Sequence, residues 1–517
     1  MRADWARAVA MLPERMTAHL GLATAAVALA VLVCAPLVLA MAARPRLRGP
    51  VLAVAAVVQT VPALALLALF YPFLLLVSGL SERLIGVSVP ALGFLPSLLA
   101  LSLYALLPLL RGGADGLASV PAATLDAADG IGMTRRQRLW MVELPLAAPI
   151  LMGGLRVATV WTIGAATLAT TIGQMSLGDL IFAGLQLQDW ALVVTGCLAA
   201  AGLAIWVDLA LGRVEAGWSA RKPAMVWLGI AGLALLVAVA VSARALTASG
   251  PGAARPVVVG AKNFGEQYIL AELIAARLRA QGQPAEVRSG LGSAIAFQAL
   301  AAGDIDVYVD YSGTLWSGAL GHGAPVPRND MLKALQRELP ARHGVTVAAV
   351  LGFENAYALA MKRERAWGLG IRTLDDLARQ AGGLRLATDI EFQSRSEWAA
   401  LQRVHGLKFA SLQAFTPTLM VKALSSGTAD VITAFSSDGR IVADDLVLIE
   451  DRRGALPSYD ALLLVGPRRP WLAARLAGLE GAIDVTIMRE ANWRVDRDTD
   501  KQTPEAAAAW LEPRIGP

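Results

Sequence analysis

The chain is poor in cysteine and histidine, the residues that most often build metal sites and nucleophilic active sites. Only two cysteines occur among its 517 residues, Cys34 and Cys197, and neither belongs to a CxxC pair. Both lie in apolar segments, so a disulfide framework and a thiolate metal site are unsupported. The four histidines are scattered, without metal-ligand spacing or a nucleophile motif. We therefore expect no catalytic residues, no metal site and no cofactor.

Two further absences concern phosphate chemistry. The phosphate-binding pattern G-x-x-x-x-G-K-[ST] does not occur, so the chain carries no ATPase of its own of that kind. The net charge of +5 and the pI of about 9.3 come largely from basic residues at the ends of apolar segments. A nucleic-acid binder would gather these charges in a stripe or patch, so nucleic acid is not an expected partner.

The 56% hydrophobic content hides two compositions. Residues 1–247 consist mostly of long apolar runs and predict an all-α membrane domain. Residues 257–517 carry frequent charges and predict a water-soluble α/β domain. The stretch 248–256, ASGPGAARP, is rich in Gly, Ala and Pro and predicts a flexible linker.

Six segments are long enough to cross a hydrocarbon core, which takes about 20 apolar residues. The second is overlong and contains Gln59, Pro62 and Pro72, so we expect it to be tilted or broken. A cleaved signal peptide is the competing interpretation of the first, although its apolar core is long and a tail precedes it. The predicted spans are 20–42, 51–80, 91–110, 148–172, 191–211 and 225–246.

The basic residues predict the orientation of these spans, because cytoplasmic loops are enriched in Lys and Arg. Three loops that share one side carry ten such residues, while the other side holds only Arg83 and three arginines of the N-terminal tail. We therefore expect the soluble half outside the cytoplasm of a bacterial inner membrane. The ten residues are Arg44, Arg46, Arg48, Arg111, Arg135, Arg136, Arg138, Arg213, Arg221 and Lys222.

Charged residues are few within the predicted spans, and two of them are Arg156 and Asp208. The simplest interpretation is that each reaches toward the nearer membrane surface. A role in a transport pathway is the alternative.

The loop 111–146 contains an acidic and alanine-rich start, a glycine and a final Leu-Pro. An alanine-rich turn ended by glycine predicts a short helix–turn–helix that protrudes from the membrane. The spacing resembles the motif by which permeases of ABC importers contact their ATPase, with Asp in place of Glu and Val142 in place of Ile. An ordinary amphipathic loop is the alternative. The matching positions are Asp126, Ala127, Ala128, Gly132, Leu144 and Pro145.

In the soluble half, predicted strands alternate with predicted helices, which indicates a parallel or mixed sheet. The pattern occurs twice, so we expect two lobes with a cleft between them. Asn263 is a plausible N-cap of the first helix. The expected strands are 257–260, 285–288, 306–311, 345–351, 356–361, 384–388, 431–434, 447–450 and 461–465, and the expected helices are 263–280, 293–302, 374–380, 396–405 and 418–425.

Five stretches in this half bring in a second resemblance. In order they are GAKNFGEQYILAELI, GDIDVYVDYSGT, FENAYALAM, ADVITAFSSDGRI and LPSYDA. Together they resemble the substrate-binding proteins of glycine betaine, carnitine and choline (osmoprotectant) ABC importers, over essentially all of 257–517. Some members of that family are fused to the permease, and this chain resembles such a fusion.

The resemblance implies a quaternary ammonium ligand held in an aromatic cage. The cage would draw on Tyr311, Tyr357, Phe435 and Tyr459, and Asn263 is added to the site. By the same resemblance Thr314 would hydrogen-bond the ligand, and Arg395 would hold a ligand carboxylate through its two-pronged guanidinium. Gly265, Phe435 and Trp398 depart from the usual pattern and leave the ligand open among glycine betaine, choline, carnitine and ergothioneine.

The resemblance further implies partners and a mechanism. We expect a separate cytoplasmic ABC ATPase, surrounding membrane lipid, and a second permease, either another copy of this chain or a different one. A membrane sensor that binds the ligand without transport is the alternative, and a tethered hydrolase is a more remote one.

Overall fold

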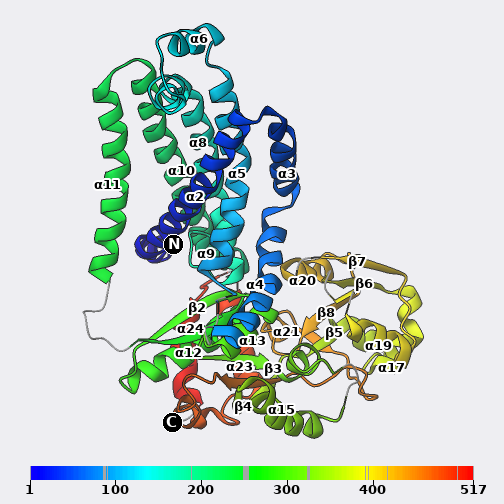
Figure 1. Ribbon diagram of the computed structural model, residues 1–517. Helices are drawn as coiled ribbons and strands as arrows, with labels where there is room; N and C mark the ends of the chain where they lie inside the picture. The colour runs from blue at the N-terminus through cyan, green and yellow to red at the C-terminus, as the bar shows by residue number, and fades with distance from the viewer. Residues whose placement is uncertain are drawn as a thin grey trace. The chain divides into compact units, whose positions relative to one another are not determined.

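The computed structural model describes residues 2–85, 89, 91–187, 189–247, 255–322, 326–389, 392–393, 395–415, 417–497 and 499–515. Its contacts divide the chain into two compact units, Met1–Ala253 and Ala254–Pro517. The first unit is helical, and the second combines two sheets with helices (Figure 1). Most of the predicted linker, 248–254, lies outside the described residues.

Fourteen helical elements of the first unit follow one another in the described residues. They are α1 Arg2–Ala10, α2 Leu12–Ala43, η1 Pro45–Leu47, α3 Arg48–Thr60, α4 Ala63–Ile85, α5 Phe94–Ala118, α6 Ala122–Gly130, α7 Arg135–Arg138, η2 Leu139–Glu143, α8 Leu144–Ala166, η3 Thr167–Ile172, α9 Gly178–Leu187, α10 Trp190–Ser219 and α11 Pro223–Thr247.

Five described stretches are long and apolar enough to cross a membrane. They are Leu12–Ala43, Ala63–Ser81, Phe94–Ala118, Arg135–Ile172 and Trp190–Ser219. The sixth predicted span corresponds to α11, whose described apolar part, Pro223–Val239, is shorter. The membrane domain predicted from the sequence is thus confirmed as a helical unit, and its five candidate spans are close to the six that were predicted.

The second predicted span is two helices. α3 ends at Thr60, Val61 is extended with φ −70° and ψ 126°, and α4 begins at Ala63. The cause is Pro62, which has no N–H to donate and disfavours helical geometry in the residue before it. The expectation of a tilted or broken segment is confirmed as a break.

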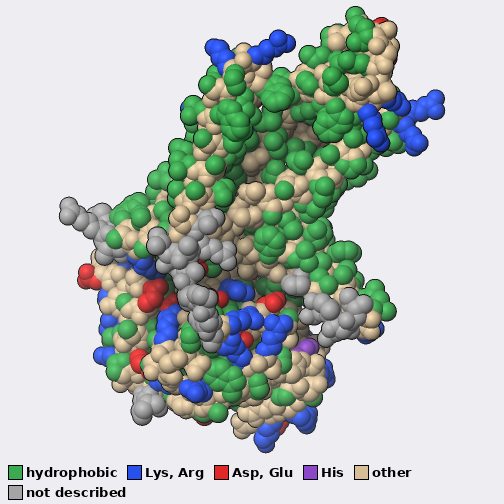
Figure 2. All heavy atoms as spheres, turned by 60° about the vertical axis from the view of Figure 1, so that its left-hand side comes forward, with side chains coloured by type: hydrophobic (Ala, Val, Ile, Leu, Met, Phe, Trp, Pro, Cys, Tyr) green, Lys and Arg blue, Asp and Glu red, His purple; other side chains and the backbone are tan. Residues whose placement is uncertain are grey.

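Small residues let the helices of this unit approach closely. A Cβ added to Gly112 of α5 would lie 2.9 Å from the Cα of Gly154 in α8, and one added to Gly154 would lie 2.8 Å from the carbonyl oxygen of Pro108. Such glycine contacts are typical of helices packed in a membrane. Hydrophobic side chains cover most of the visible flank of the unit, and basic side chains gather at one end of it (Figure 2).

The three basic loops lie at the same end of the helical unit. Arg48, at the start of α3, donates to Asp115 near the end of α5 at 2.5 Å. Trp218, near the end of α10, donates to the carbonyl of Pro145 at 3.3 Å. The loops that the charge pattern assigned to one side of the membrane are therefore neighbours in space.

Two of the three N-terminal arginines, which did not fit the charge pattern, have acidic partners within the unit. Arg7 lies 4.0 Å from Asp189, and Arg15 lies 3.8 Å from Asp179.

Arg156 does not reach toward a membrane surface on its own, as the simplest interpretation had it. It forms a two-pronged ion pair with Asp208, with nitrogen–oxygen distances of 3.1 and 2.9 Å, and a third bond of 2.7 Å to Glu215. These bonds join α8 to α10. The carboxylates neutralise a charge that an apolar surrounding would penalise.

The second unit contains two five-stranded sheets. In the first the order is β2-β1-β3-β10-β4, and in the second it is β7-β6-β8-β5-β9. Each sheet is mixed: β1, β2 and β3 are parallel and β10 runs against β3 and β4, while β6, β7 and β8 are parallel and β5 runs against β8 and β9. The strands are β1 Val257–Lys262, β2 Ala285–Leu291, β3 Val307–Tyr311, β4 Thr346–Glu354, β5 Tyr357–Lys362, β6 Arg385–Thr388, β7 Ser411–Ala414, β8 Val431–Phe435, β9 Leu446–Leu448 and β10 Asp460–Val465.

The chain passes between the sheets twice, from β4 to β5 and from β9 to β10. This confirms the predicted two-lobed α/β domain. The helices are α12 Gly265–Ala280, α13 Ser293–Ala302, α14 Ser312–Thr314, η4 Leu315–Ala319, α15 Arg328–His343, α16 Arg363–Gly368, α17 Leu374–Gln380, η5 Ala381–Gly383, α19 Ser396–His405, α20 Pro417–Ser425, α21 Arg440–Ala443, α22 Leu472–Arg475, η6 Ala477–Leu479, α23 Val485–Asp496, α24 Pro504–Leu511 and η7 Glu512–Arg514.

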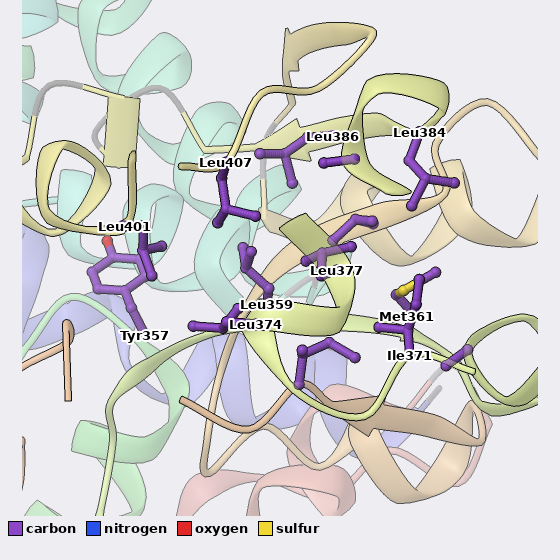
Figure 3. Close-up of a cluster of buried hydrophobic side chains, with 14 of the residues drawn as sticks. Tyr357, Leu359, Met361, Ile371, Leu374, Leu377, Leu384, Leu386, Leu401 and Leu407 are labelled. Atoms are coloured by element: carbon purple, nitrogen blue, oxygen red, sulfur yellow. The ribbon is translucent and has the colours of Figure 1, made fainter. Parts of the chain in front are cut away.

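The second lobe has its own apolar core between its sheet and the helices α17 and α19. Leucines such as Leu359 of β5 and Leu377 of α17 fill it, and Tyr357 lies at its edge beside Leu401 (Figure 3).

Several local details differ from the sequence expectations. α12 begins at Gly265 with Phe264 at the N-cap position, so Asn263 is exposed in the preceding turn and is not the N-cap. Phe264 N–H donates to the carbonyl of Lys262 at 3.0 Å, and this tight turn shifts the start of the helix to Gly265. The strand β7 was not predicted, because it has only four residues, mostly exposed. The helix α15 was not predicted either.

Candidate functional site

The loop between α5 and α8 forms the predicted helix–turn–helix. α6 ends at Gly130, and Gly132 has φ +81°, the left-handed conformation that favours glycine. Gly132 N–H donates to the Asp129 carbonyl at 3.0 Å, and Met133 N–H donates to the Ala128 carbonyl at 3.1 Å. These two bonds make a Schellman motif, which ends a helix and reverses the chain.

The second arm of this loop is also fixed by its own side chains. Thr134 and Gln137 form a capping box at the start of α7. Arg138 donates to Asp129 at 2.5 Å and to Glu143 at 2.8 Å, so one guanidinium joins both arms. The loop is therefore a preformed knob.

The surface of this knob carries both predicted and unpredicted residues. Asp126, Ala127 and Pro145 are exposed, Leu144 is half-buried and Ala128 is buried. The sequence did not single out three apolar side chains that are largely exposed here, Ile131, Trp140 and Met141 at 75%, 69% and 65%. Their presence in a loop rich in arginine is a signal that could have been noticed, because exposed apolar side chains often mark contact surfaces.

The predicted ligand residues converge on the two connections between the lobes. Tyr357 pairs with Phe435 across β5 and β8. Asn355 N–H, in the first connection, donates to the carbonyl of Tyr459, at the end of the second, at 3.0 Å. A Cβ added to Gly313 would lie 2.8 Å from the ring of Tyr459, so the turn after Tyr311 packs on that ring. Residues far apart in sequence therefore meet in one place.

Tyr311 is held by a buried carboxylate. Its hydroxyl donates to Glu266 at 2.5 Å and accepts from Gln267 at 3.1 Å. Glu266 also accepts from the side-chain amides of Asn355 at 2.9 Å and Asn492 at 2.8 Å. Burial raises the pKa of Glu266, and burial together with the nearby carboxylate raises that of Tyr311.

Three more aromatic rings cluster around Tyr357. Its ring centroid lies 4.6 Å from that of Phe435 and 4.9 Å from that of Phe392. Trp398 follows at 6.0 Å from Phe392. Tyr357 and Phe435, two members of the predicted cage, are therefore in contact, and Trp398 lies one ring behind them.

Arg395 lies within the same group and is already engaged. Its guanidinium carbon lies 5.2 Å from the ring centroid of Tyr357, a cation–π contact. Its Nε and Nη2 donate to Glu397 Oε1 at 3.1 and 2.9 Å, and Nη2 also donates to the Tyr459 hydroxyl at 3.1 Å. The Tyr459 hydroxyl donates to Glu397 as well. Glu397 itself is 4% exposed.

These contacts set the charge state of the pair. Burial opposes the charge on Arg395, but the bond to Glu397 outweighs it and raises the pKa of the guanidinium. Burial likewise opposes the charge on Glu397, but the bonds from Arg395 and Tyr459 lower the pKa of the carboxyl. Both groups are therefore ionised and neutralise one another.

Two predicted residues remain, Thr314 and Asn263. Thr314 ends the short α14 and is half-buried, and Asn263 is exposed in the turn between β1 and α12. Asp438 and Arg440 brace one turn, with Arg440 Nη2 2.6 Å from Asp438. The sequence analysis missed Glu266, Glu397, Asn355 and Asn492. Glu266 stands in the NFGEQ stretch and Glu397 two residues after Arg395, but a carboxylate behind a tyrosine cannot be recognised from spacing.

The described residues contain no group of three or more His, Cys, Asp or Glu side chains that could hold a metal ion. A two-lobed α/β domain with aromatic rings at the inter-lobe connections, joined to a helical membrane unit, defines the class: a binding receptor fused to a membrane transport component.

The comparisons with known proteins give the family. Residues 255–513 match the substrate binding domain of ABC-type glycine betaine transport systems, and residues 32–249 match the inner membrane component of binding-protein-dependent transport systems. The chain belongs to this family as a fused permease and substrate-binding domain for osmoprotectant-type uptake. The expectation of a transport component rather than an enzyme is confirmed, and such a permease works with a small-molecule substrate and a separate ABC ATPase in the inner membrane.

Several relatives illustrate the match. The ergothioneine transport permease/ergothioneine binding protein EgtU of Helicobacter pylori (strain G27) is 28% identical over 88% of this chain and 82% of its own length. The choline transport system permease protein OpuBB of Bacillus subtilis (strain 168) is 38% identical over 38% of this chain and 83% of its own length. A crystal structure of a glycine betaine/carnitine/choline ABC transporter is 26% identical, covers 49% of this chain and 97% of that chain, and has a TM-score of 0.46.

Proposed function

We propose that this chain imports a quaternary ammonium compound such as glycine betaine, choline or carnitine. The observation that carries the proposal is the convergence of Tyr357, Phe435 and Tyr459 on the inter-lobe connections, with Tyr311 joined to them through Glu266 and Asn355. A trimethylammonium group has no N–H to donate, so ring faces are the groups that hold it, at about 0.5–2 kcal/mol for each good contact.

Each side chain has a role in this proposal. The rings of Tyr311, Tyr357, Phe435 and Tyr459 surround the cationic head. Thr314 and Asn263 offer hydrogen bonds from the rim. Arg395 lies beside Tyr357 and Tyr459, where it shapes the cage.

The transport cycle follows from the two units. The ligand closes the lobes, the closed receptor delivers it to the membrane unit, and the ATPase drives release. We assign the soluble unit to the outer side of the inner membrane, and the loop 111–146 to the cytoplasm. There Asp126, Ala127, Ala128, Gly132, Leu144 and Pro145 form or support the surface that meets the ATPase. Two copies of the chain, surrounded by lipid, would build the pathway.

Ergothioneine is the second candidate ligand. It also carries a trimethylammonium head, and the relative named for its transport aligns with both halves of this chain. The permeases named for choline and carnitine align with the membrane half alone, over 38% to 39% of the chain.

A ligand panel tests the proposal on the full-length chain in lipid nanodiscs. We expect glycine betaine, choline, carnitine or ergothioneine to raise the melting temperature, and Tyr459→Ala to weaken binding by about tenfold or more. The control is Trp367→Ala, because Trp367 is 60% exposed on α16, away from the cage. A panel without any shift, or equal affinity in Tyr459→Ala and wild type, would contradict the cage.

A further inference from the structure

The guanidinium of Arg395 has no two-pronged edge left for a ligand carboxylate. A carboxylate can bind side-on through Nε and Nη2 or end-on through Nη1 and Nη2, and both modes require Nη2. The two hydrogens of Nη2 are directed to Glu397 and Tyr459, and the Nε hydrogen is directed to Glu397. The role that the resemblance implied for Arg395 therefore meets a competitor within the chain.

We infer that Glu397 is a specificity-determining residue: it takes the place of a ligand carboxylate on Arg395, so the site selects its ligand by the cationic head and is indifferent to a carboxylate. The inference rests on the proposed function and names the substrate class of the same site. That class comprises trimethylammonium compounds with or without an acid group.

Displacement of Glu397 by a ligand carboxylate would add little to the free energy of ligand binding. The exchange replaces one carboxylate by another on the same guanidinium. Glu397, 4% exposed, would then stay behind as a buried charge without its cationic partner. Removing one member of a buried pair is strongly destabilising, so the internal pair persists when the ligand arrives.

A second cage tyrosine, Tyr311, also has a buried carboxylate at its hydroxyl. The hydroxyl of Tyr311 donates to this carboxylate, Glu266, whose other donors include the uncharged side chains of Asn355 and Asn492. Two of the predicted rings thus have a carboxylate at the hydroxyl end.

The test compares ligands that share a head and differ in the acid group. Calorimetry on the full-length chain in nanodiscs measures glycine betaine against its methyl ester, and ergothioneine against its methyl ester. For whichever pair binds, we expect wild-type affinities within about threefold of each other. In Glu397→Gln, the uncharged amide oxygen holds Arg395 less strongly than a ligand carboxylate does, so the free acid should bind at least about tenfold more tightly than the ester.

Two further variants complete the design. Arg395→Gln should change the affinity for acid and ester by the same factor, whereas an arginine that clamps the ligand would lose the acid alone. Glu512→Gln is the matched control, since Glu512 pairs with Arg277 at 2.8 Å outside the cage, and it should leave the ratio unchanged.

The outcomes separate the two claims. A wild-type preference for the acid above tenfold, or a Glu397→Gln ratio equal to that of wild type in a variant that melts cooperatively, overturns the specificity role and leaves the cage intact. If neither these acids and esters nor choline and carnitine bind, the proposed function is refuted, and the specificity role with it.

Discussion

Tyr311 and Tyr459 combine an apolar ring with a hydroxyl whose hydrogen goes to a buried carboxylate, Glu266 and Glu397 respectively. A buried hydroxyl needs a partner, and a carboxylate fixes the ring more firmly than a neutral acceptor would. The rings are therefore positioned before any ligand arrives. Preorganisation of this kind reduces the entropy lost on binding.

Glu266 makes stability depend on pH. Burial raises its pKa, so the folded protein binds this proton more readily than the unfolded chain does. The free energy of unfolding is therefore highest below the unfolded pKa and falls as the pH rises through the folded pKa, by about 1.4 kcal/mol for each unit between the two.

The variant Glu266→Gln removes this titration. We expect its melting temperature, relative to wild type, to rise as the pH increases from 4.5 to 8, measured by differential scanning fluorimetry on the full-length chain. The control is Glu364→Gln, because Glu364 is exposed on α16. A difference between variant and wild type that is the same at both pH values would show that Glu266 does not titrate in this range.

At the scale of elements, the loop between α5 and α8 depends on the reversal at Gly132. Its φ of +81° is closed to proline, whose ring fixes φ near −65°. The Schellman bonds of Gly132 and Met133 would be lost, and the knob that carries Asp126 and Ala127 would change shape.

We therefore expect Gly132→Pro to keep ligand affinity within about twofold and to reduce uptake at least about tenfold. Calorimetry on the chain in nanodiscs and uptake of labelled ligand into proteoliposomes with the ATPase measure the two effects. Gly130→Ala is the matched control, since a Cβ there meets open space and the position is helical. Normal uptake by Gly132→Pro would contradict a coupling role and would indicate that this segment is an ordinary interhelical loop.

At the scale of the whole molecule, the assignment of sides follows from charge. The three basic loops lie at one end of the helical unit. We expect Trp367→Cys, in a chain whose Cys34 and Cys197 are replaced by alanine, to react with an impermeant maleimide in intact spheroplasts. Arg135→Cys, in the exposed α7, should react after permeabilisation only. The reverse pattern of labelling would invert the topology.

The sequence by itself determined the architecture. Long apolar runs predict membrane helices, because a helix satisfies all backbone hydrogen bonds of a single segment within lipid. Pro62 marked the break between α3 and α4. The strand and helix periods predicted both lobes, and Gly132 marked the turn of the loop. These features depend on neighbours along the chain, which is why the sequence displays them.

The tertiary structure alone decided which groups meet. Arg395 and Glu397 lie two residues apart, yet their link to Tyr459 spans more than sixty positions. Glu266 receives Tyr311, Asn355 and Asn492 from three separate elements, and Arg156 finds Asp208 on another helix. Whether a guanidinium is available to a ligand or already neutralised depends on charge at a few ångströms in a buried place. That distance is set by the folding of remote segments onto one another, and residue order does not record it.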